Sequence, residues 1–201
     1  MSIRVQRFSG GGLERHIDEL ARLRIEVFRE FPYLYRGSLD YERKYLKTYM
    51  GVADSVIVLA FDGERVVGAS TGLPMESETD EVKGPFVAHG YDPARVFYFG
   101  ESVLEGSYRG KGLGVRFFEE REAHARGLGL FDWTCFCAVQ RPADHPRRPP
   151  GYVPLDAFWK KRGYAKHPEL ATTFSWQELD EETESEKPMV FWLKRIGAPA
   201  P

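Results

Sequence analysis

Three glycines and two cations lie close together in the segment YRGKGLG, Tyr108 to Gly114. An apolar run precedes this segment, and a pattern typical of a helix follows it. Glycine lets a backbone approach a ligand closely, and the free N–H groups and positive dipole end at a helix start attract phosphate. Arg109 and Lys111 could add charge-assisted hydrogen bonds to such a ligand. The segment therefore indicates a phosphate-binding loop.

The glycine spacing excludes two common nucleotide-binding loops. A P-loop needs a glycine, four residues and then Gly-Lys-Ser/Thr, but here Gly112 follows Lys111 and Glu105 takes the place of the first glycine. The dinucleotide fingerprint G-x-G-x-x-G fails as well, because Gly110, Gly112 and Gly114 give G-x-G-x-G. Neither nucleotide-binding motif is therefore present, and a glycine loop before a helix, taken alone, is more often an ordinary connection.

Three side chains are candidates for proton transfer. Glu101 lies within FYFGESVL, where partial desolvation would suit a general base, although an ion pair with a neighbouring arginine is an equally good interpretation. Tyr98 is the second candidate. A regular strand puts it on the face opposite Glu101, so only one of the two faces the ligand unless a bulge intervenes. His145 is third because imidazole titrates near neutrality, but a surface histidine without a role explains it better.

Composition excludes several classes of protein. The 201 residues, 42% of them hydrophobic, are expected to form one domain over 1–201 with a sizeable core. A net charge of -2 gives no reason to expect binding to nucleic acid or to an anionic membrane. The N-terminus has no signal-peptide pattern and no window reaches the ~18 apolar residues of a membrane span, so a cytoplasmic location is expected.

The predicted elements favour an α/β fold. A strand, a helix and a strand in succession should give a parallel pair, so we expect a central mixed sheet of about seven strands flanked by about four helices. In chain order the sequence predicts a strand in IRVQRF, a helix over 17–31, a helix from Ser38, a hairpin turning at Asp62 and Gly63, a loop from Glu76 to Pro93, a strand from Arg95 to Leu104, a helix ending near Gly127 and Gly129, a strand in LFDWTCFCAV, a proline-rich excursion, a short helix stopped by Gly163, and a closing hairpin.

The glycine loop resembles the pyrophosphate-binding signature of the GNAT superfamily of acyl-CoA-dependent N-acyltransferases. That signature reads Arg or Gln, two residues, Gly, one residue, and Gly or Ala, and Arg109, Gly112 and Gly114 match it. The order of elements is similar to that of the family over nearly the whole chain, and FWKKRGY resembles the family's element ending in Gly-Phe or Gly-Tyr.

The resemblance implies that acetyl-CoA is the co-substrate and that no metal is needed. The pantetheine arm would lie like an extra strand against backbone groups near Val103 and Leu104, where an amide could face the thioester oxygen. An amine would attack the thioester directly, with a base to take its proton. The pyrophosphate would lie over the amides of Arg109, Gly110, Lys111, Gly112, Leu113 and Gly114.

One departure from the family leaves the general acid open. Family members often carry a tyrosine four residues before the Gly-Phe, but here that position is Trp159, whose indole is not a useful proton donor to a leaving group. Cys135 and Cys137, which would share one face of a strand, are alternative donors, although buried thiols are usually inert packing. A coenzyme thiolate with a pKa near ~8.5, by analogy with cysteine, can also leave unprotonated.

Two segments are expected to border the acceptor, since loops at the end of a rigid sheet often carry specificity. They are the aromatic EFPYLYRG, with Phe31, Tyr33 and Tyr35, and the basic DHPRRPPGY, with His145. A small-molecule amine is the expected acceptor, because a long excursion folded over the cleft would exclude peptides. The protein is expected to be a monomer or a homodimer. A protein or peptide acceptor is the first alternative. A non-catalytic acyl-CoA sensor, which Trp159 keeps open, is the second.

Overall fold

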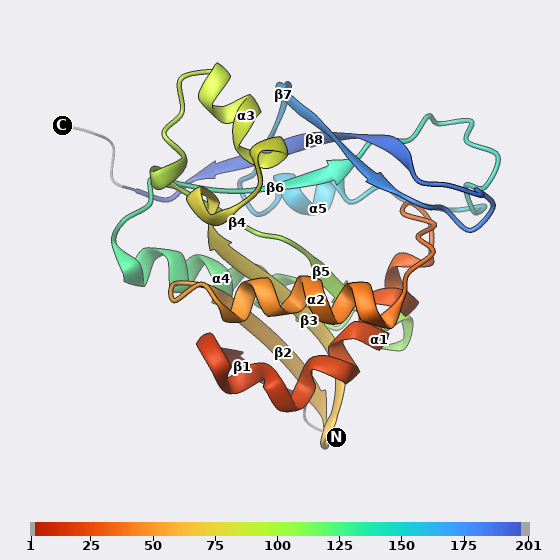
Figure 1. Ribbon diagram of the computed structural model, residues 1–201, viewed down its shortest axis with the longest axis horizontal. Coiled ribbons are helices and arrows are strands. Elements are labelled where there is room, and N and C mark those ends of the chain that lie inside the picture. The colour runs from red at the N-terminus through yellow and green to blue at the C-terminus, as the bar shows by residue number, and fades with distance from the viewer. Residues whose placement is uncertain (1–2, 198–201) are drawn as a thin grey trace.

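A computed structural model describes residues 3–197, in which eight strands form one mixed sheet (Figure 1). The strand order is β1-β2-β3-β4-β6-β8-β7, and β5 pairs with β3 beyond the end of β4. The strands are β1 (Arg4–Phe8), β2 (Val56–Asp62), β3 (Arg65–Pro74), β4 (Val96–Tyr98), β5 (Ser102–Leu104), β6 (Trp133–Val139), β7 (Ala165–Trp176) and β8 (Ser185–Arg195).

Helices cover both faces of this sheet. Figure 1 shows α1 and α2 in front of the sheet, α4 and α5 behind it, and α3 beside β7. Ser38 caps α2, as its sequence predicts, and its hydroxyl accepts the Tyr41 N–H at 3.3 Å. No helix in residues 3–197 is both long and apolar enough to cross a membrane. The helices are α1 (Ile17–Phe28), α2 (Leu39–Met50), α3 (Asp80–Ala88), α4 (Leu113–Leu128) and α5 (Asp156–Lys160).

The sheet divides the core into two apolar layers. Leu20, Leu46 and Phe86 are fully buried in the layer under α1, α2 and α3. Phe117 and Trp192 belong to the layer under α4 and α5. Burial of each such side chain contributes about 1.5–3 kcal/mol, so both layers hold the sheet as a rigid support for the loops at its edge.

The predicted strand from Arg95 to Leu104 is in fact two short strands joined by a β-bulge. Leu73 pairs with Tyr98 and Ser70 pairs with Ser102, so two residues of β3 face the three residues 99–101. A bulge bends its strand and shifts the alternation of side chains beyond it. As a result β4 pairs with β6 in parallel, as expected, whereas within the described chain β5 pairs with β3 alone. This split gives eight strands where about seven are predicted.

The predicted loop from Glu76 to Pro93 is wrong, because it contains α3. The Phe86 ring packs 4.9 Å from the Phe191 ring of β8. Gly84 and Pro85 lie inside this helix, and such a pair is typical of a turn, which hides the helical period. Residues 75–95 therefore form a structured connection between the hairpin and β4.

Candidate functional site

The glycine loop leads into α4 with an uncapped, open helix start. Gly110 and Gly112 adopt left-handed φ angles of 75° and 84°, which favour glycine. Gly112 is the N-cap residue and provides no side-chain hydrogen bond, while a Cβ placed on it would meet no atom within 4 Å. The first amides of a helix have no intrahelical acceptor. The loop therefore has both the space and the free N–H groups that a pyrophosphate needs.

Gly114 is required by the packing of α5 against the first turn of α4. A Cβ at this position would lie 3.3 Å from Cζ of Phe158, which is tighter than most such contacts. Leu113 beside it is buried in the layer under α4 and α5. These two residues fix the helix start to the sheet, so the loop has a defined position.

The two cations of the loop make different contacts. Arg109 forms an ion pair with Glu30, with Nη1 2.7 Å from Oε2, and its Nε donates to the Leu104 carbonyl oxygen at 3.1 Å. Nζ of Lys111 lies 5.0 Å from the centroid of the Tyr108 ring, on the exposed side of the loop. The sequence predicts that both side chains contact phosphate. Lys111 is free to do so as it stands, whereas Arg109 would first have to break its ion pair with Glu30.

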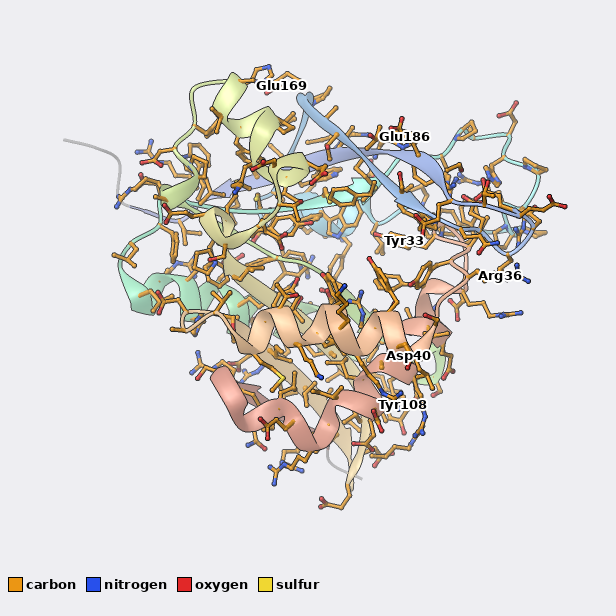
Figure 2. The ribbon with its side chains drawn as sticks, in the orientation of Figure 1. Tyr33, Arg36, Asp40, Tyr108, Glu169 and Glu186 are labelled. Atoms are coloured by element: carbon orange, nitrogen blue, oxygen red, sulfur yellow. The ribbon has the colours of Figure 1, made fainter. Side chains whose placement is uncertain are left out.

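The loop is also fastened to the β2–β3 hairpin. The hydroxyl of Tyr108, labelled in Figure 2, donates to Oδ2 of Asp62 at 2.6 Å. Arg65, just beyond the hairpin turn, forms an ion pair with Glu105 at 2.6 Å. Since the hairpin is part of the sheet, these contacts hold the loop at the end of β5.

β5 presents a row of peptide groups to its open side. The Glu105 N–H donates to the Val67 carbonyl oxygen at 3.0 Å, so in this antiparallel pair Val103 also directs its peptide groups toward β3. Those of Ser102 and Leu104 point the other way, and no strand within residues 3–197 pairs with them. Of the two predicted positions, Leu104 therefore faces the open edge and Val103 does not.

The facing edge of β6 is open over the same stretch. The Phe99 N–H donates to the Cys135 carbonyl oxygen at 2.8 Å, and this is the last hydrogen bond between the two strands in the described chain. Beyond it β6 pairs with β8 alone, up to Val139. Two unpaired edges thus diverge from the bulge, and such edges are templates for adding an extended chain.

Glu101 is held in a buried ion pair. Nη1 of Arg24 lies 2.5 Å from its Oε1, and Nε of the same arginine lies 2.5 Å from Oε2 of Glu42. Burial alone would lower the pKa of Arg24, but its two carboxylate partners raise that pKa well above the ordinary value. The sequence leaves two interpretations of Glu101 open, a general base or the partner of an arginine. The structure supports the second, with Arg24 as that arginine.

The bulge overturns the expectation that Tyr98 and Glu101 lie on opposite faces. Both lie on the face covered by α1 and α2, where the Tyr45 hydroxyl donates to Oε2 of Glu101 at 3.2 Å. Gly100 also faces this side, since a Cβ on it would collide with the hydroxyl of Tyr49. One extra residue therefore brings both predicted catalytic side chains to one face.

Arg121 holds the bulge from the other face and is not among the residues that the sequence indicates. It is 1% exposed, and Nη1 donates to the carbonyl oxygens of Thr71 at 3.1 Å and of Glu101 at 3.0 Å. Burial lowers the pKa of Arg121 to about 10. The sequence does contain a sign that Arg121 is buried. It lies four residues after Phe117 and four before Ala125, on the buried stripe of α4.

Tyr98 and Cys137 form a protonated pair beside the open edge of β6. The phenol oxygen lies 3.1 Å from the sulfur. Burial raises the pKa of Cys137 to about 12 and raises the pKa of Tyr98 well above its ordinary value. Both groups therefore keep their protons near neutral pH, so neither serves as a base there, and the raised pKa values also make them weak acids.

Phe31 and His145 come together at one end of this face. The Phe31 ring lies 5.5 Å from the His145 ring and 4.7 Å from the Tyr152 ring, so the aromatic segment packs on the proline-rich excursion. Nδ1 of His145 accepts the Arg147 N–H at 3.2 Å. The two segments that are expected to border the acceptor thus contact each other.

Tyr33 and Tyr35 lie in different surroundings. Figure 2 shows Tyr33 between the α1–α2 layer and the β7–β8 hairpin, and its ring lies 4.7 Å from Phe28 and 5.9 Å from Trp176. Burial raises the pKa of both phenols, and the nearby charge of Glu42 adds to this effect at Tyr35. Tyr33 therefore packs between α1 and β7, whereas Tyr35 lies near the Glu42 carboxylate.

Arg141 fastens the excursion and is also absent from the predicted site. Its Nε donates to the Pro32 carbonyl oxygen at 2.8 Å, and its Nη2 lies 2.5 Å from Oε1 of Glu178. Arg147 in turn forms an ion pair with Asp180 at 2.5 Å. These cations are therefore neutralised by the turn between β7 and β8.

Trp159 packs in the layer behind the sheet. Its ring lies 5.1 Å from both the Phe136 and the Trp192 rings. Tyr98 and Glu101 lie on the other face, so Trp159 is part of a packed aromatic cluster and not of their group. Among residues 3–197 there is no group of three or more metal-ligating side chains.

No family model matches the sequence, and no curated protein matches it significantly. Solved structures do resemble the chain. An acetyltransferase of the GNAT family from Streptococcus pneumoniae is 12% identical, covers 98% of this chain and 100% of its own, and superposes with a TM-score of 0.58. The ribosomal-protein-alanine N-acetyltransferase from Brucella melitensis is 12% identical, with a TM-score of 0.63 over 96% of this chain and 99% of its own.

A third similar structure contains the coenzyme. It is the PaiA N-acetyltransferase from Thermoplasma acidophilum in complex with coenzyme A, 13% identical, with a TM-score of 0.59 over 98% of this chain and 100% of its own. At such identities the likeness concerns the fold. The chain therefore has the fold of GNAT acetyltransferases, as its sequence predicts.

Proposed function

We propose that this protein is an acetyl-CoA-dependent N-acetyltransferase whose acceptor is a small-molecule amine. The observation that carries the proposal is the open edge of β5, which runs from the bulge at 99–101 to the uncapped start of α4. An extended chain with amides and a pyrophosphate at one end matches the chemistry of this edge and of the loop that follows it. Acetyl-CoA has that form, and it is the co-substrate of the fold.

The coenzyme would be held mainly by backbone groups. Its pyrophosphate lies over the amides of residues 109–114, with Lys111 on the exposed side. The peptide groups of Ser102 and Leu104 hydrogen-bond to the pantetheine arm, which extends the sheet by one strand. When bound, acetyl-CoA supplies an activated carbonyl carbon for attack by the amine. We expect the N–H of Ser102, which points to this open edge directly after the bulge, to face the carbonyl oxygen as negative charge develops on it.

A small acceptor is favoured by the way the excursion closes one end of the site. Phe31 packs on His145 and Tyr152, and Arg141 joins the excursion to the Pro32 carbonyl oxygen. A peptide needs a groove that is open at both ends. The contacts between these loops therefore support a compact amine over a peptide.

A thiol-release assay tests the proposal. Purified protein is mixed with acetyl-CoA and, in turn, with monoamines, diamines, amino acids and short peptides, and free thiol is followed with time. Turnover of a small amine is the expected result. Turnover of peptides alone would move the function to the protein acetyltransferases. Binding of acetyl-CoA without turnover of any acceptor would identify a sensor.

A further inference from the structure

Glu78 lies in the segment between β3 and β4 and is held close to the face that carries Tyr98 and Glu101. Met75, three residues earlier, is fully buried, and its carbonyl oxygen accepts the Glu78 N–H at 2.9 Å. The Glu78 side chain is half-buried. Its position is thus fixed by the core under α1, α2 and α3 and not by a free loop.

The charge of Glu78 acts on groups from three different elements of this face. Burial is the main reason why each of these groups has a raised pKa, and the negative charge of Glu78 raises that pKa further. The turn Met75–Ser77, directly before Glu78, packs on β4, and Met75 belongs to the same core cluster as Tyr98 and Cys135, so Glu78 lies near these groups. They are Tyr45, Tyr49, Tyr98, Cys135 and Cys137.

Glu78 differs from the other carboxylates of this face in having no cation partner. Glu101 and Glu42 share Arg24. Within residues 3–197 no ion pair involves Glu78, and the nearby Lys83 pairs with Asp80 at 3.3 Å. One oxygen of Glu78 accepts the N–H of Thr79 at 3.3 Å. The other oxygen is left for a ligand.

Two effects suit this carboxylate to accept a proton. Burial raises its pKa, and the charge of Glu101 adds to this effect, while the Thr79 N–H and Lys83 oppose it. A general base works best when its pKa approaches the working pH. The other titratable groups that face it are unsuited, because the phenols and thiols keep their protons and Glu101 is bound to Arg24.

We infer that Glu78 is the general base of the acetyl transfer and that it binds the amino group of the acceptor. This inference rests on the proposed function. As the acceptor nitrogen forms its bond to the thioester carbon, the C–S bond breaks and its electron pair leaves on sulfur. The nitrogen gives one proton to Glu78, which then passes that proton through solvent to the coenzyme thiolate. The products are an amide and free coenzyme A, and Glu78 is regenerated.

The same geometry indicates the class of acceptor. A half-buried carboxylate without a cation attracts an ammonium group, which loses one proton to solvent before its nitrogen can attack. Arg141 and Arg147 are neutralised by Glu178 and Asp180, whereas Arg148 lies 5.0 Å from the Tyr152 ring and has no ion pair within residues 3–197. An anionic group is therefore compatible with the far end of an acceptor, near Arg148, but not with the end that binds Glu78. We therefore expect a primary aliphatic amine, or a diamine, without a carboxylate beside the reacting nitrogen.

The test compares Glu78→Gln with Glu76→Gln, which removes an exposed carboxylate two residues earlier in the same segment. Acetyl-CoA affinity is measured by calorimetry, and kcat/KM is measured against pH with n-butylamine and 1,4-diaminobutane. Glu78→Gln should lower kcat/KM by ~10²- to 10⁴-fold, as is typical for loss of a base, and should abolish the fall in rate at acidic pH. Coenzyme affinity should stay within about twofold, because the pyrophosphate and pantetheine sites are untouched. Glu76→Gln should behave as the wild type.

The outcomes separate this inference from the function on which it rests. A Glu78→Gln protein that keeps the wild-type rate and its acidic limb would overturn the inference and leave the acetyltransferase in place. An equal loss of rate in both variants would also overturn it, because a general loss of negative charge would then explain the effect. Wild-type protein that binds acetyl-CoA but acetylates no amine would overturn the proposed function and the role of Glu78 together.

Discussion

Nη1 of Arg121 lies 3.0 Å from the carbonyl oxygen of Glu101, so a cation on one face of the sheet holds the backbone of a carboxylate that points to the other face. The same guanidinium donates to the Ser102 hydroxyl at 2.8 Å. It also stacks over Phe99, 4.1 Å from the ring centroid. Arg121 therefore joins both sides of the bulge, where the two halves of the predicted strand separate.

Arg121→Met should destabilise the fold strongly. Methionine fills much of the volume but removes the hydrogen bonds to the carbonyl oxygens of Thr71 and Glu101 and to the Ser102 hydroxyl, each worth about 0.5–1.5 kcal/mol, since the two carbonyl oxygens keep a backbone donor. We expect the free energy of unfolding to fall by about 2–5 kcal/mol in urea titrations. The matched control is Arg126→Met on the same helix, where an ion pair with Glu122 is half-exposed and a loss below about 1 kcal/mol is expected. Equal losses would show that the helix, and not the bulge contact, is sensitive to charge.

Glu101→Gln should act on stability more than on chemistry. The amide cannot neutralise Arg24, which would keep Glu42 as its one carboxylate partner in the described chain. Unfolding free energy is expected to fall by about 1–3 kcal/mol, while kcat per folded molecule changes little. Urea titration and the thiol-release assay measure the two quantities on the same sample. A loss of rate of ~10²-fold or more at unchanged stability would return the role of base to Glu101.

The elements that depend on local chemistry could be predicted from the sequence. Ser38 begins α2 and Gly129 ends α4, because caps and left-handed glycines act within one turn of a helix. The turn at Asp62 and Gly63 fixes the β2–β3 hairpin in the same way. The glycine loop at the start of α4 needs no more than its own spacing to be recognised.

The features that depend on partners distant in sequence could not be predicted. The bulge is defined by pairing with β3. Residues 99–101 contain one residue too many only because Ser70 pairs with Ser102 and Leu73 pairs with Tyr98. The partner of Glu101 is set by the packing of α1, which places Arg24 beneath α2. Glu78 could not be singled out either, because Gly84 and Pro85 make the sequence around it resemble a loop.

Gly112→Glu should abolish binding of acetyl-CoA. The new side chain must adopt a left-handed backbone, and its charge would repel the pyrophosphate at the start of α4. Gly90→Glu is the matched control, since Gly90 has a φ of 79° and equally open space but lies after α3. Calorimetry should detect no binding by the first variant and wild-type affinity for the second. Equal affinities in two folded variants would remove the basis for placing the coenzyme at this loop.

Trp159→Tyr should be tolerated. The indole packs between Phe136 and Trp192, and the smaller phenol should lower the unfolding free energy by less than about 1.5 kcal/mol. The rate should be maintained, because Trp159 packs on the face of the sheet opposite to Tyr98 and Glu101. The profile of kcat against pH checks this expectation. A large loss of rate would mean that the tryptophan shapes the thioester site and that α5 reaches it.

Stability should decrease in mildly alkaline solution because of the two thiols. Burial raises the pKa of Cys137 to about 12 and that of Cys135 well above its ordinary value. In the unfolded chain both thiols have a pKa near ~8.5. Between this value and the higher folded values, the native state therefore binds more protons than the unfolded state. The unfolding free energy must then fall as pH rises through this window, by up to about 1.4 kcal/mol per pH unit for the fully buried thiol of Cys135. Replacing both cysteines by alanine should flatten the curve between pH ~8 and ~9, below the range where unfolded tyrosines, with a pKa near ~10, ionise. The Tm is measured across this range for both proteins. An equally steep fall in the double variant would assign the pH dependence to groups other than the thiols.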